Sequence, residues 1–340
     1  MVYDTRIISD SDEDLQYAAQ LIKDGKIVGM PTETVYGLAA DALNPSAVAD
    51  IFKAKGRPQD NPLIVHLASA DDIDKYTQNI PETAYRLAEM FCPGPLTMVL
   101  PKRECIPDIT SAGLDTVGIR IPADSTARRF IAACGTPIAA PSANLSGSPS
   151  PTTAKHVFQD MQGRIPAIID GGSCCVGVES TVVSFEGDNI VLLRPGFISP
   201  EELSAAGEVI IGKGITEAVS DGEIVRSPGM KYKHYSPKAN VTIIEGSSEK
   251  YAEYVISKNE IGTAAMCFAS ETSELERCGV KCVPYGNTSE EQAQLLFLRL
   301  RECDELGFKQ VYAHCPEKNG VGLAVYNRLL RAAGFEVIKL

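Results

Sequence analysis

The chain has 340 residues, of which 44% are hydrophobic and 22% are charged, and its formal net charge at pH 7 is -12. This length exceeds one comfortable hydrophobic core and predicts two globular domains. The excess of acidic residues argues against a broad surface that grips a nucleic-acid backbone, because such binding needs clustered Lys and Arg. We therefore expect no strong direct nucleic-acid binding, and any polyanionic ligand should meet a local basic pocket.

The N-terminal residues 1–6 lack the basic start and apolar run of a signal peptide, and no stretch approaches the roughly 20 apolar residues of a membrane span. Ten cysteines are scattered without a CxxC pair, which favours small core residues in a reducing compartment over a disulfide framework. Cys278 and Cys282 come closest to metal-ligand spacing, but they stand without a second pair, so structural zinc is disfavoured. The expected location is the cytoplasm, with no membrane association.

The first two hundred residues alternate helical patterns with short strands rich in β-branched residues. Ser11 opens a predicted helix that ends at Gly25, and Asn44 with Pro45 starts another that ends near Lys55. Two more helices are predicted from Pro81 to before Pro93 and from Ser125 to Gly135, with strands at 26–30, 63–67, 96–100, 117–121, 137–140, 167–169, 180–185 and 190–193.

Several connections between these strands are too short for crossover helices, so residues 1–207 are predicted to form a twisted, mixed α/β sheet domain. Residues 208–239 lose their periodicity and are rich in Gly and Pro, which indicates an interdomain linker. Residues 240–340 are predicted to form a smaller, Rossmann-like α/β domain with an open parallel sheet. Its strands are expected at 241–244, 263–268, 282–285, 310–313 and 335–338, and its helices at 249–257, 289–306 and 323–333.

The segment from Phe52 to Pro62 is the most informative in the chain. Lys55 and Arg57 flank Gly56 at the end of a predicted helix. If the chain turns at Gly56, the two cations converge and form a phosphate clamp, with Arg binding bidentately and Lys acting as a point charge. The alternative is a solvated pair that favours the helix C-terminus.

A second segment, residues 141–151, follows an apolar strand and supplies hydroxyl, amide and backbone N–H groups with almost no charge. Such donors suit a triphosphate or an adenine, although a turn stiffened by prolines is a plain alternative. Residues 31–38 similarly place two hydroxyls, a carboxylate and a phenol after a strand, where an ordinary strand exit is the alternative. Together, segments 52–62 and 141–151 suggest a nucleotide site.

Three further places carry polar groups among apolar residues. Arg120 lies within the apolar strand 117–122 and needs a partner, either a bound carboxylate or a structural Asp or Glu, because an unpaired buried charge is costly. His66 alternates with apolar neighbours, and a lone His of this kind is more often a satisfied core residue than a ligand. Segments 177–182 and 193–196 place polar residues at strand edges, and basic and aromatic residues at 231–235 either contact the site or dock on the domain surface.

Taken together, these segments resemble the threonylcarbamoyl-AMP synthase family in its long form, a YrdC-like domain followed by a linker and a smaller C-terminal domain. The hallmark is a KxR element paired with a distant SxN element, met by Lys55-Gly56-Arg57 and Ser142-Ala143-Asn144. The surrounding strings make the resemblance specific over essentially the whole chain: PTETVYGLAADA, KGRPQDNPLIVH, PGPLT, APSANLSG, GVESTVV, LLRPG and, in the linker, SPGMKYKHYSP.

The resemblance implies a nucleotidyltransferase that converts L-threonine, bicarbonate or CO2, and ATP into threonylcarbamoyl-adenylate and pyrophosphate, with Mg2+. The product would pass to a separate transferase complex that modifies the adenosine beside the anticodon of tRNAs. Lys55 and Arg57 would be catalytic, Arg120 would hold the carboxylate of threonine, and the metal ligands are not identified. Threonine would be held by Thr34, His66, Arg120 and Ser180, and ATP by Lys55, Arg57, Asn61, Thr116, Ser142, Asn144, Ser150 and Arg194, with Tyr235 closing over the site from the linker.

Other interpretations stay open. The chain is alternatively an RNA-binding YrdC-like module without synthase activity. A second interpretation keeps the fold and changes the chemistry to carbamoyl transfer in hydrogenase maturation, but the sequence shows neither the acylphosphatase-like nor the zinc-finger module of those YrdC-like proteins. Finally, the C-terminal domain is a candidate nucleotide-binding regulator, but its Gly320-Val321-Gly322 segment is too generic to decide.

Overall fold

The computed structural model describes residues 2–59, 61–212, 215 and 235–340. Contacts divide the chain into two compact units, one from residues 1–146 and 150–231 and the other from residues 147–149 and 232–340. Residues 209–211 of the predicted linker form a strand, and most of the remaining linker lies outside the described residues. The domain boundaries 207/208 and 239/240 therefore stay a prediction.

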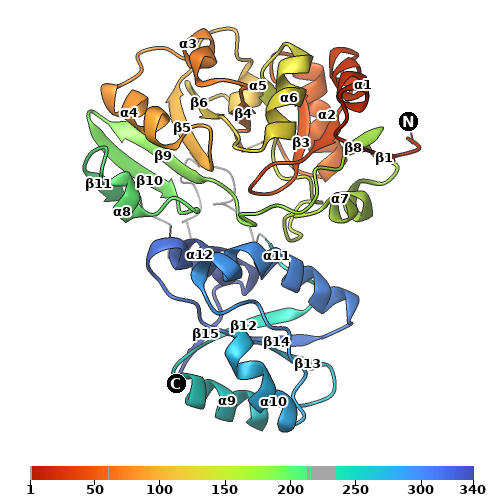
Figure 1. The fold of residues 1–340 in the computed structure, drawn as a ribbon, viewed down its shortest axis with the longest axis vertical. Helices are drawn as coiled ribbons and strands as arrows, with labels where there is room; N and C mark the ends of the chain where they lie inside the picture. The colour runs from red at the N-terminus through yellow and green to blue at the C-terminus, as the bar shows by residue number, and fades with distance from the viewer. Residues whose placement is uncertain (1, 60, 213–214, 216–234) are drawn as a thin grey trace. The chain divides into compact units, whose positions relative to one another are not determined.

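An eleven-stranded mixed sheet forms the centre of the first unit, with the strand order β1-β8-β2-β3-β7-β4-β6-β5-β9-β10-β11 (Figure 1). In its middle, β6 runs parallel to β4 and antiparallel to β5, and β5 runs parallel to β9. This confirms the predicted mixed sheet. The strands are β1 (Arg6–Ile8), β2 (Val28–Met30), β3 (Gly37–Asp41), β4 (Ile64–His66), β5 (Leu96–Pro101), β6 (Thr116–Arg120), β7 (Ile138–Ala139), β8 (Ala167–Ile169), β9 (Thr181–Glu186), β10 (Asn189–Arg194) and β11 (Val209–Ile211).

Helices of the first unit begin and end where capping residues predict. The Ser11 side chain accepts a hydrogen bond from the Asp14 N–H at the start of α1, and Asn44 caps α2 in the same way. Gly56 ends α2 in the left-handed conformation with φ of 63°, which turns the chain directly after Lys55. The helices are α1 (Asp12–Lys23), α2 (Pro45–Lys55), α3 (Ile73–Tyr76), α4 (Glu82–Phe91), α5 (Asp108–Ser111), α6 (Ser125–Cys134), α7 (Ala154–Met161) and α8 (Pro200–Leu203).

The second unit has a four-stranded sheet in which every pair is parallel, with the order β13-β14-β12-β15. Helices α9 and α10 cover one face of this sheet, and α11 and α12 cover the other (Figure 1). The predicted Rossmann-like parallel sheet is therefore confirmed. Its elements are β12 (Asn240–Glu245), α9 (Ser248–Ser257), β13 (Thr263–Met266), α10 (Thr272–Arg277), α11 (Ser289–Glu305), β14 (Gln310–His314), α12 (Gly320–Ala332) and β15 (Val337–Lys339).

One predicted strand of the second unit is wrong. Residues 282–285 form no regular strand: beside the isolated bridge between Ala265 and Cys282, Val283 N donates to Ala265 O over 2.8 Å and Tyr285 N donates to Cys267 O over 3.1 Å. Gly286 then leaves the extended conformation with φ of 102°. The segment therefore makes a few backbone bonds to residues 265–267 without the continuous ladder of a strand.

No helix of the described ranges combines the length and the apolar character needed to cross a bilayer.

Candidate functional site

Polar side chains gather on one face of the central strands of the first unit. The register places His66 of β4 and Thr97 of β5 on either side of Arg120 in β6. Residues paired across neighbouring strands point to the same face, so these three side chains lie together. Thr97 Oγ1 lies 2.8 Å from Ser180 Oγ. The structure thus brings His66, Arg120 and Ser180, three of the predicted threonine-binding residues, into one cluster.

Arg120 has a structural partner on the loop between β2 and β3. Glu33 Oε1 lies 2.7 Å from Arg120 Nη2, and each side chain is only 5% exposed. Of the two partners that the sequence allowed, the structural carboxylate is therefore present. The pair does not use all the polar atoms, because Arg120 Nε and Glu33 Oε2 have no hydrogen-bond partner among the described residues. The guanidinium can therefore bind a second anion through its remaining N–H donors.

His66 is buried and neutral at physiological pH. Burial, and next the positive charge of Arg120, lower the pKa of His66 to about 3. Its Nδ1 has no hydrogen-bond partner within the part of the chain that the structure describes. A neutral imidazole with an unused nitrogen can donate to or accept from a hydroxyl group. This differs from the satisfied core histidine that the sequence left as the alternative.

Thr34 lies on the same loop as Glu33 and is fully buried. The Thr32 hydroxyl donates to Val35 O over 2.6 Å, so the 2.9 Å contact between the Thr32 and Thr34 hydroxyls has Thr34 as its donor. Backbone bonds fix this loop against the second predicted segment, because Ala143 N donates to Tyr36 O over 2.8 Å. Residues 31–38 and 141–151 are thereby neighbours.

Lys55 ends α2 and points at the Ser142 segment. Its Nζ donates to Asn144 O over 2.8 Å and also to Ser142 O. Lys55 is only 3% exposed, so it is not the solvated residue of the alternative interpretation. Burial, and next the positive charge of Arg57, lower the pKa of Lys55 to about 7.

The SxN element is ordered by its own side chains. Ser142 Oγ donates to Asn144 Oδ1 over 2.5 Å, and Asn144 Nδ2 donates to Leu145 O over 2.8 Å. Asn61, the predicted ATP ligand ahead of β4, is completely buried. The structure therefore puts a buried lysine against a tightly bonded loop, and the roles of these residues toward ATP stay predictions.

Two buried residues of the GVEST string connect the remaining predicted ligands. Ser150 Oγ donates to Glu179 Oε1 over 2.6 Å. Arg194 Nη2 donates to Ser180 O over 3.0 Å and to Ser180 Oγ over 3.1 Å. Gly196 makes this approach possible, since a Cβ there would lie 2.1 Å from Thr181 N. Ser150, Ser180 and Arg194 thus converge on residues 179–180.

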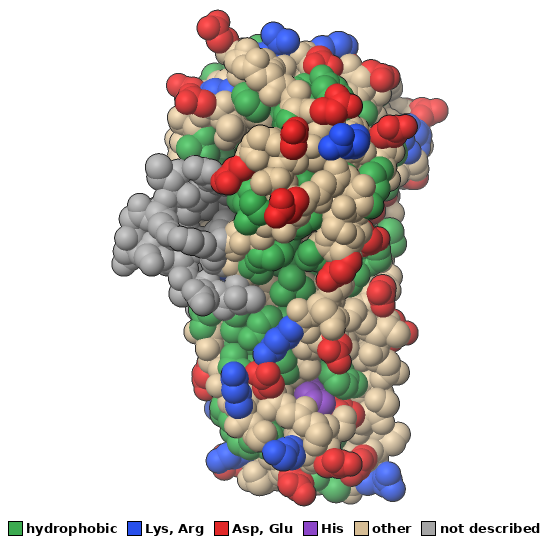
Figure 2. Space-filling model, turned by 90° about the vertical axis from the view of Figure 1, so that its left-hand side faces the viewer, with side chains coloured by type: hydrophobic (Ala, Val, Ile, Leu, Met, Phe, Trp, Pro, Cys, Tyr) green, Lys and Arg blue, Asp and Glu red, His purple; other side chains and the backbone are tan. Residues whose placement is uncertain are grey.

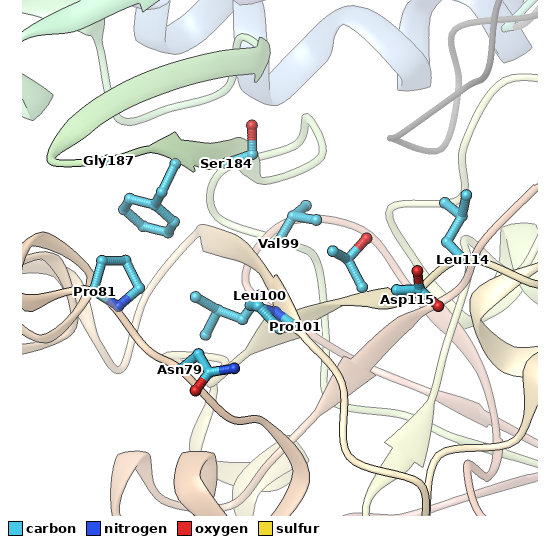
Figure 3. Close-up of a pocket in the computed structure, with 11 residues that line it drawn as sticks. Asn79, Pro81, Val99, Leu100, Pro101, Leu114, Asp115, Ser184 and Gly187 are labelled. Carbon is cyan, nitrogen blue, oxygen red and sulfur yellow. The ribbon is translucent and has the colours of Figure 1, made fainter.

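Thr116 lies apart from this cluster. It begins β6, whereas Arg120 ends it, and the two share a face roughly 13 Å apart at the usual rise of a strand. Between them Gly118 has no side chain, and a Cβ there would lie 3.1 Å from Thr97 Cγ2. Thr116 lines a cavity of about 570 Å³ (Figure 3), with Asn79, Pro81, Val99, Leu100, Pro101, Leu114, Asp115, Ser184, Phe185 and Gly187.

Tyr235 belongs to the second unit. It is 5% exposed, has a positive φ of 63°, and its ring centroid lies 5.1 Å from that of Phe297. The expectation that Tyr235 closes over the site therefore stays a prediction.

Three residues that matter for this geometry were not singled out as ligands from the sequence: Glu33, Thr97 and Glu179. Glu33 and Glu179 stand inside the quoted strings PTETVYGLAADA and GVESTVV, so a signal was present. Thr97 follows PGPL in an apolar strand. Its importance comes from the register that pairs it with Arg120, which the sequence does not reveal.

The described residues contain no preformed metal-binding cluster, and the visible face carries no large basic surface. Within that part of the chain, no group of three or more His, Cys, Asp or Glu is arranged to hold a metal ion. On the face seen in Figure 2, red acidic and blue basic side chains are interspersed, and the visible described surface has no continuous basic area. A Mg2+ ion carried by a nucleotide needs no such cluster, because phosphate oxygens and one or two carboxylates usually hold it.

Comparisons with known proteins agree over the length of the chain. The Sua5, YciO and YrdC family model described as "Telomere recombination" matches residues 20–196, and the model described as "Threonylcarbamoyl-AMP synthase, C-terminal domain" matches residues 198–334. The chain is 45% identical to a threonylcarbamoyl-AMP synthase of Pyrococcus abyssi, covering 96% of each chain. It is 44% identical to that of Bacillus subtilis, covering 98% of this chain and 96% of the relative. The crystal structure of P. abyssi Sua5 complexed with L-threonine is similar, with a TM-score of 0.90, 42% identity and 99% coverage of both chains.

Proposed function

Because the chain belongs to the threonylcarbamoyl-AMP synthase family in its two-domain form, we propose that it makes threonylcarbamoyl-AMP and pyrophosphate from L-threonine, bicarbonate or CO2, and ATP. The enzyme uses ATP for adenylyl transfer, which makes it a nucleotidyltransferase. The single observation that supports this most directly is the buried cluster of Arg120, His66 and Ser180 beside the Lys55 and Ser142 segments. Its product serves threonylcarbamoyladenosine formation next to the anticodon of tRNA, through a separate transferase complex.

Threonine binds at the Arg120 end of the face. Arg120 keeps unused N–H donors beside Glu33, and an unused guanidinium donor matches a carboxylate. The neutral imidazole of His66 and the hydroxyls of Thr34 and Ser180 are short-range partners for the hydroxyl of the substrate. The choice of threonine as the ligand is supported by the crystal structure of P. abyssi Sua5 complexed with L-threonine.

ATP extends from the Lys55 end toward Thr116. Lys55 and Arg57 hold the phosphates, with Asn61, Ser142, Asn144, Ser150 and Arg194 around them. The cavity of about 570 Å³ beside Thr116 accommodates the nucleoside. Gly118, which has no side chain, leaves the sheet surface between Thr116 and Arg120 open for the ligand. Tyr235 closes the site after both substrates bind, which excludes water from a labile anhydride.

The chemistry requires positioning and charge more than a protein nucleophile. The amine of threonine loses a proton and bonds to the carbon of CO2, and a second proton leaves to solvent to give the carbamate. A carbamate oxygen then attacks the α-phosphorus of ATP, the bond to the β,γ-phosphates breaks, and pyrophosphate leaves with the electron pair. Fixed cations stabilise the charge on the phosphoryl oxygens in the transition state, and binding both substrates in line removes the entropic barrier. Lys55 and Arg57 have this role.

Mg2+ accompanies ATP and neutralises phosphate charge when bound. Glu179 would be a carboxylate ligand for this ion. The negative charge of Glu179, after that of Asp160, favours the charged form of Lys55, and Ser150 donates a hydrogen bond to one of the Glu179 oxygens.

The deciding experiment measures pyrophosphate release by the purified protein with ATP and Mg2+, with and without L-threonine and bicarbonate. Mass spectrometry of the same mixtures searches for the acyl-adenylate. Release that requires both threonine and bicarbonate is expected. Turnover that is indifferent to threonine, or no turnover, would refute the proposed substrate, and salt-dependent RNA binding would then be measured next.

A further inference from the structure

The ion pair of Glu33 and Arg120 leaves buried polar atoms of both side chains without a hydrogen bond among the described residues. Glu33 Oε1 contacts Arg120 Nη2 at 2.7 Å, whereas Glu33 Oε2 and Arg120 Nε have no hydrogen-bond partner among the described residues. Both side chains are 5% exposed, so water does not readily satisfy these atoms. Buried polar groups without partners are costly, and a native structure that keeps them at a site usually reserves them for a ligand.

The chemistry of these two atoms matches an α-amino acid. An unused carboxylate oxygen accepts from an ammonium group, and an unused guanidinium N–H donates to a carboxylate. In an α-amino acid these two charged groups are attached to one carbon, so one ligand can contact both partners of an ion pair. Building on the proposed function, we propose that Glu33 binds the α-ammonium of threonine while Arg120 binds its carboxylate.

Charge balance supports the same assignment. A substrate carboxylate placed on Arg120 stands beside the negative Glu33, and two carboxylates on one buried guanidinium leave a net negative charge. The α-ammonium of a zwitterion restores neutrality, because its positive charge lies against Glu33. The pair therefore selects zwitterionic amino acids over carboxylic acids that lack the amine. His66 adds no charge to this balance, because burial lowers its pKa to about 3.

Backbone contacts hold Glu33 where this role requires it. Val176 N donates to Glu33 O over 2.8 Å, and the Thr34 N–H donates to Thr32 Oγ1 over 3.2 Å. These bonds fix the main chain on both sides of the Glu33 side chain. The carboxylate is therefore presented to Arg120 by an ordered loop, and a ligand does not have to order it.

The test compares two ligands and uses calorimetry. One is L-threonine, and the other is the 2,3-dihydroxybutanoate of matching configuration, in which a hydroxyl replaces the ammonium. The wild-type protein is expected to bind threonine at least about tenfold more tightly, given the strength of a buried charged hydrogen bond. In Glu33→Gln this preference is expected to disappear, through weaker binding of threonine and equal or tighter binding of the dihydroxy acid.

Controls separate the inference from the proposed function. Glu33→Asp keeps the charge and should retain part of the preference, and Glu89→Gln on the surface should change nothing. If Glu33→Gln weakens both ligands by the same factor, Glu33 acts only through Arg120 and the inference is wrong. Equal binding of the two ligands by the wild type would also overturn it, even if no Glu33 variant folds. A wild-type protein that binds no threonine would refute the proposed function itself.

Discussion

Lys55 Nζ donates a 2.8 Å hydrogen bond to the carbonyl oxygen of Asn144, although 89 positions separate the two residues. The main chain reinforces the contact, because Ser146 N donates to Lys55 O over 3.0 Å. Side-chain and backbone bonds together hold the end of α2 against the SxN element. The pairing of the KxR and SxN motifs is thus a direct contact in the folded protein, and Lys55 both fixes the loop and carries a charge into it.

Removing the Lys55 ammonium should abolish most activity. In Lys55→Ala the carbonyls of Ser142 and Asn144 lose their donor and the phosphates lose a cation. We expect pyrophosphate release to fall about 100-fold or more, the range seen when one stabilising donor is removed. The matched control is Lys53→Ala on the same helix, where the lysine is 73% exposed and pairs with Asp50. Full activity in Lys55→Ala would exclude this residue from the mechanism.

ATP binding should take up a proton at pH 8. With a pKa of about 7, Lys55 in the free protein is mostly neutral at this pH. A bound triphosphate stabilises the ammonium form and raises the pKa, so up to about one proton enters with the nucleotide. Titration calorimetry in two buffers of different ionisation enthalpy measures this number. Lys55→Met should remove the uptake, and equal binding enthalpies in both buffers for the wild type would contradict the assignment.

His66 should make the first unit sensitive to acid. Its pKa of about 3 in the folded protein lies below the unfolded value of about 6.5, so the unfolded chain binds a proton that the folded chain does not. Stability therefore falls as the pH drops below 6.5. Between pH 7 and 4.5 the wild type should lose about 2–3 kcal/mol more than His66→Asn.

Denaturant titrations check this in the unfolding transition that L-threonine stabilises. Between pH 7 and 8 the free energy of unfolding of the two proteins should change in parallel, because His66 takes up little proton in either the folded or the unfolded chain. Parallel loss down to pH 4.5 would mean that His66 is not the neutral, buried group described here.

Thr116 should affect the nucleotide and not the amino acid. It lies at the opposite end of β6 from Arg120 and faces a separate cavity. Thr116→Val keeps the shape and removes the hydroxyl, so we expect ATP affinity to fall several-fold while threonine affinity changes less than about twofold. Arg120→Lys should show the reverse pattern. Calorimetric titration of each ligand distinguishes the two, and a common effect on both ligands would place Thr116 nearer to the threonine end.

Much of the fold could be predicted because local signals decide its elements. Ser11, Asn44 and Gly56 are capping residues, and the helices begin and end at them. Strands β1 and β11 were missed because each has three residues and pairs through only one edge. Strand β3 was missed because Gly37–Asp41 is built from small residues and lacks a β-branched pattern.

The site could be predicted only in part. The KxR and SxN strings indicate which residues gather, but the partner of Arg120 depends on how the loop after β2 crosses the sheet. Glu33 therefore emerged only from the structure, as did the contact of Thr97 with Ser180. The separation of Thr116 from Arg120 likewise follows from the strand geometry. Sequence motifs indicate which residues are ligands, but they do not give the distances between them.

The strand order has a consequence for how the protein acquires its site. His66, Arg120 and Ser180 are close in space, but they come from segments that lie far apart along the chain and meet only when β4, β6, β5 and β9 have paired. Closing such long loops slows folding, and contacts of this kind form late. During refolding from denaturant, threonine binding should therefore return only with the last phase of sheet formation, after the helical signal has recovered.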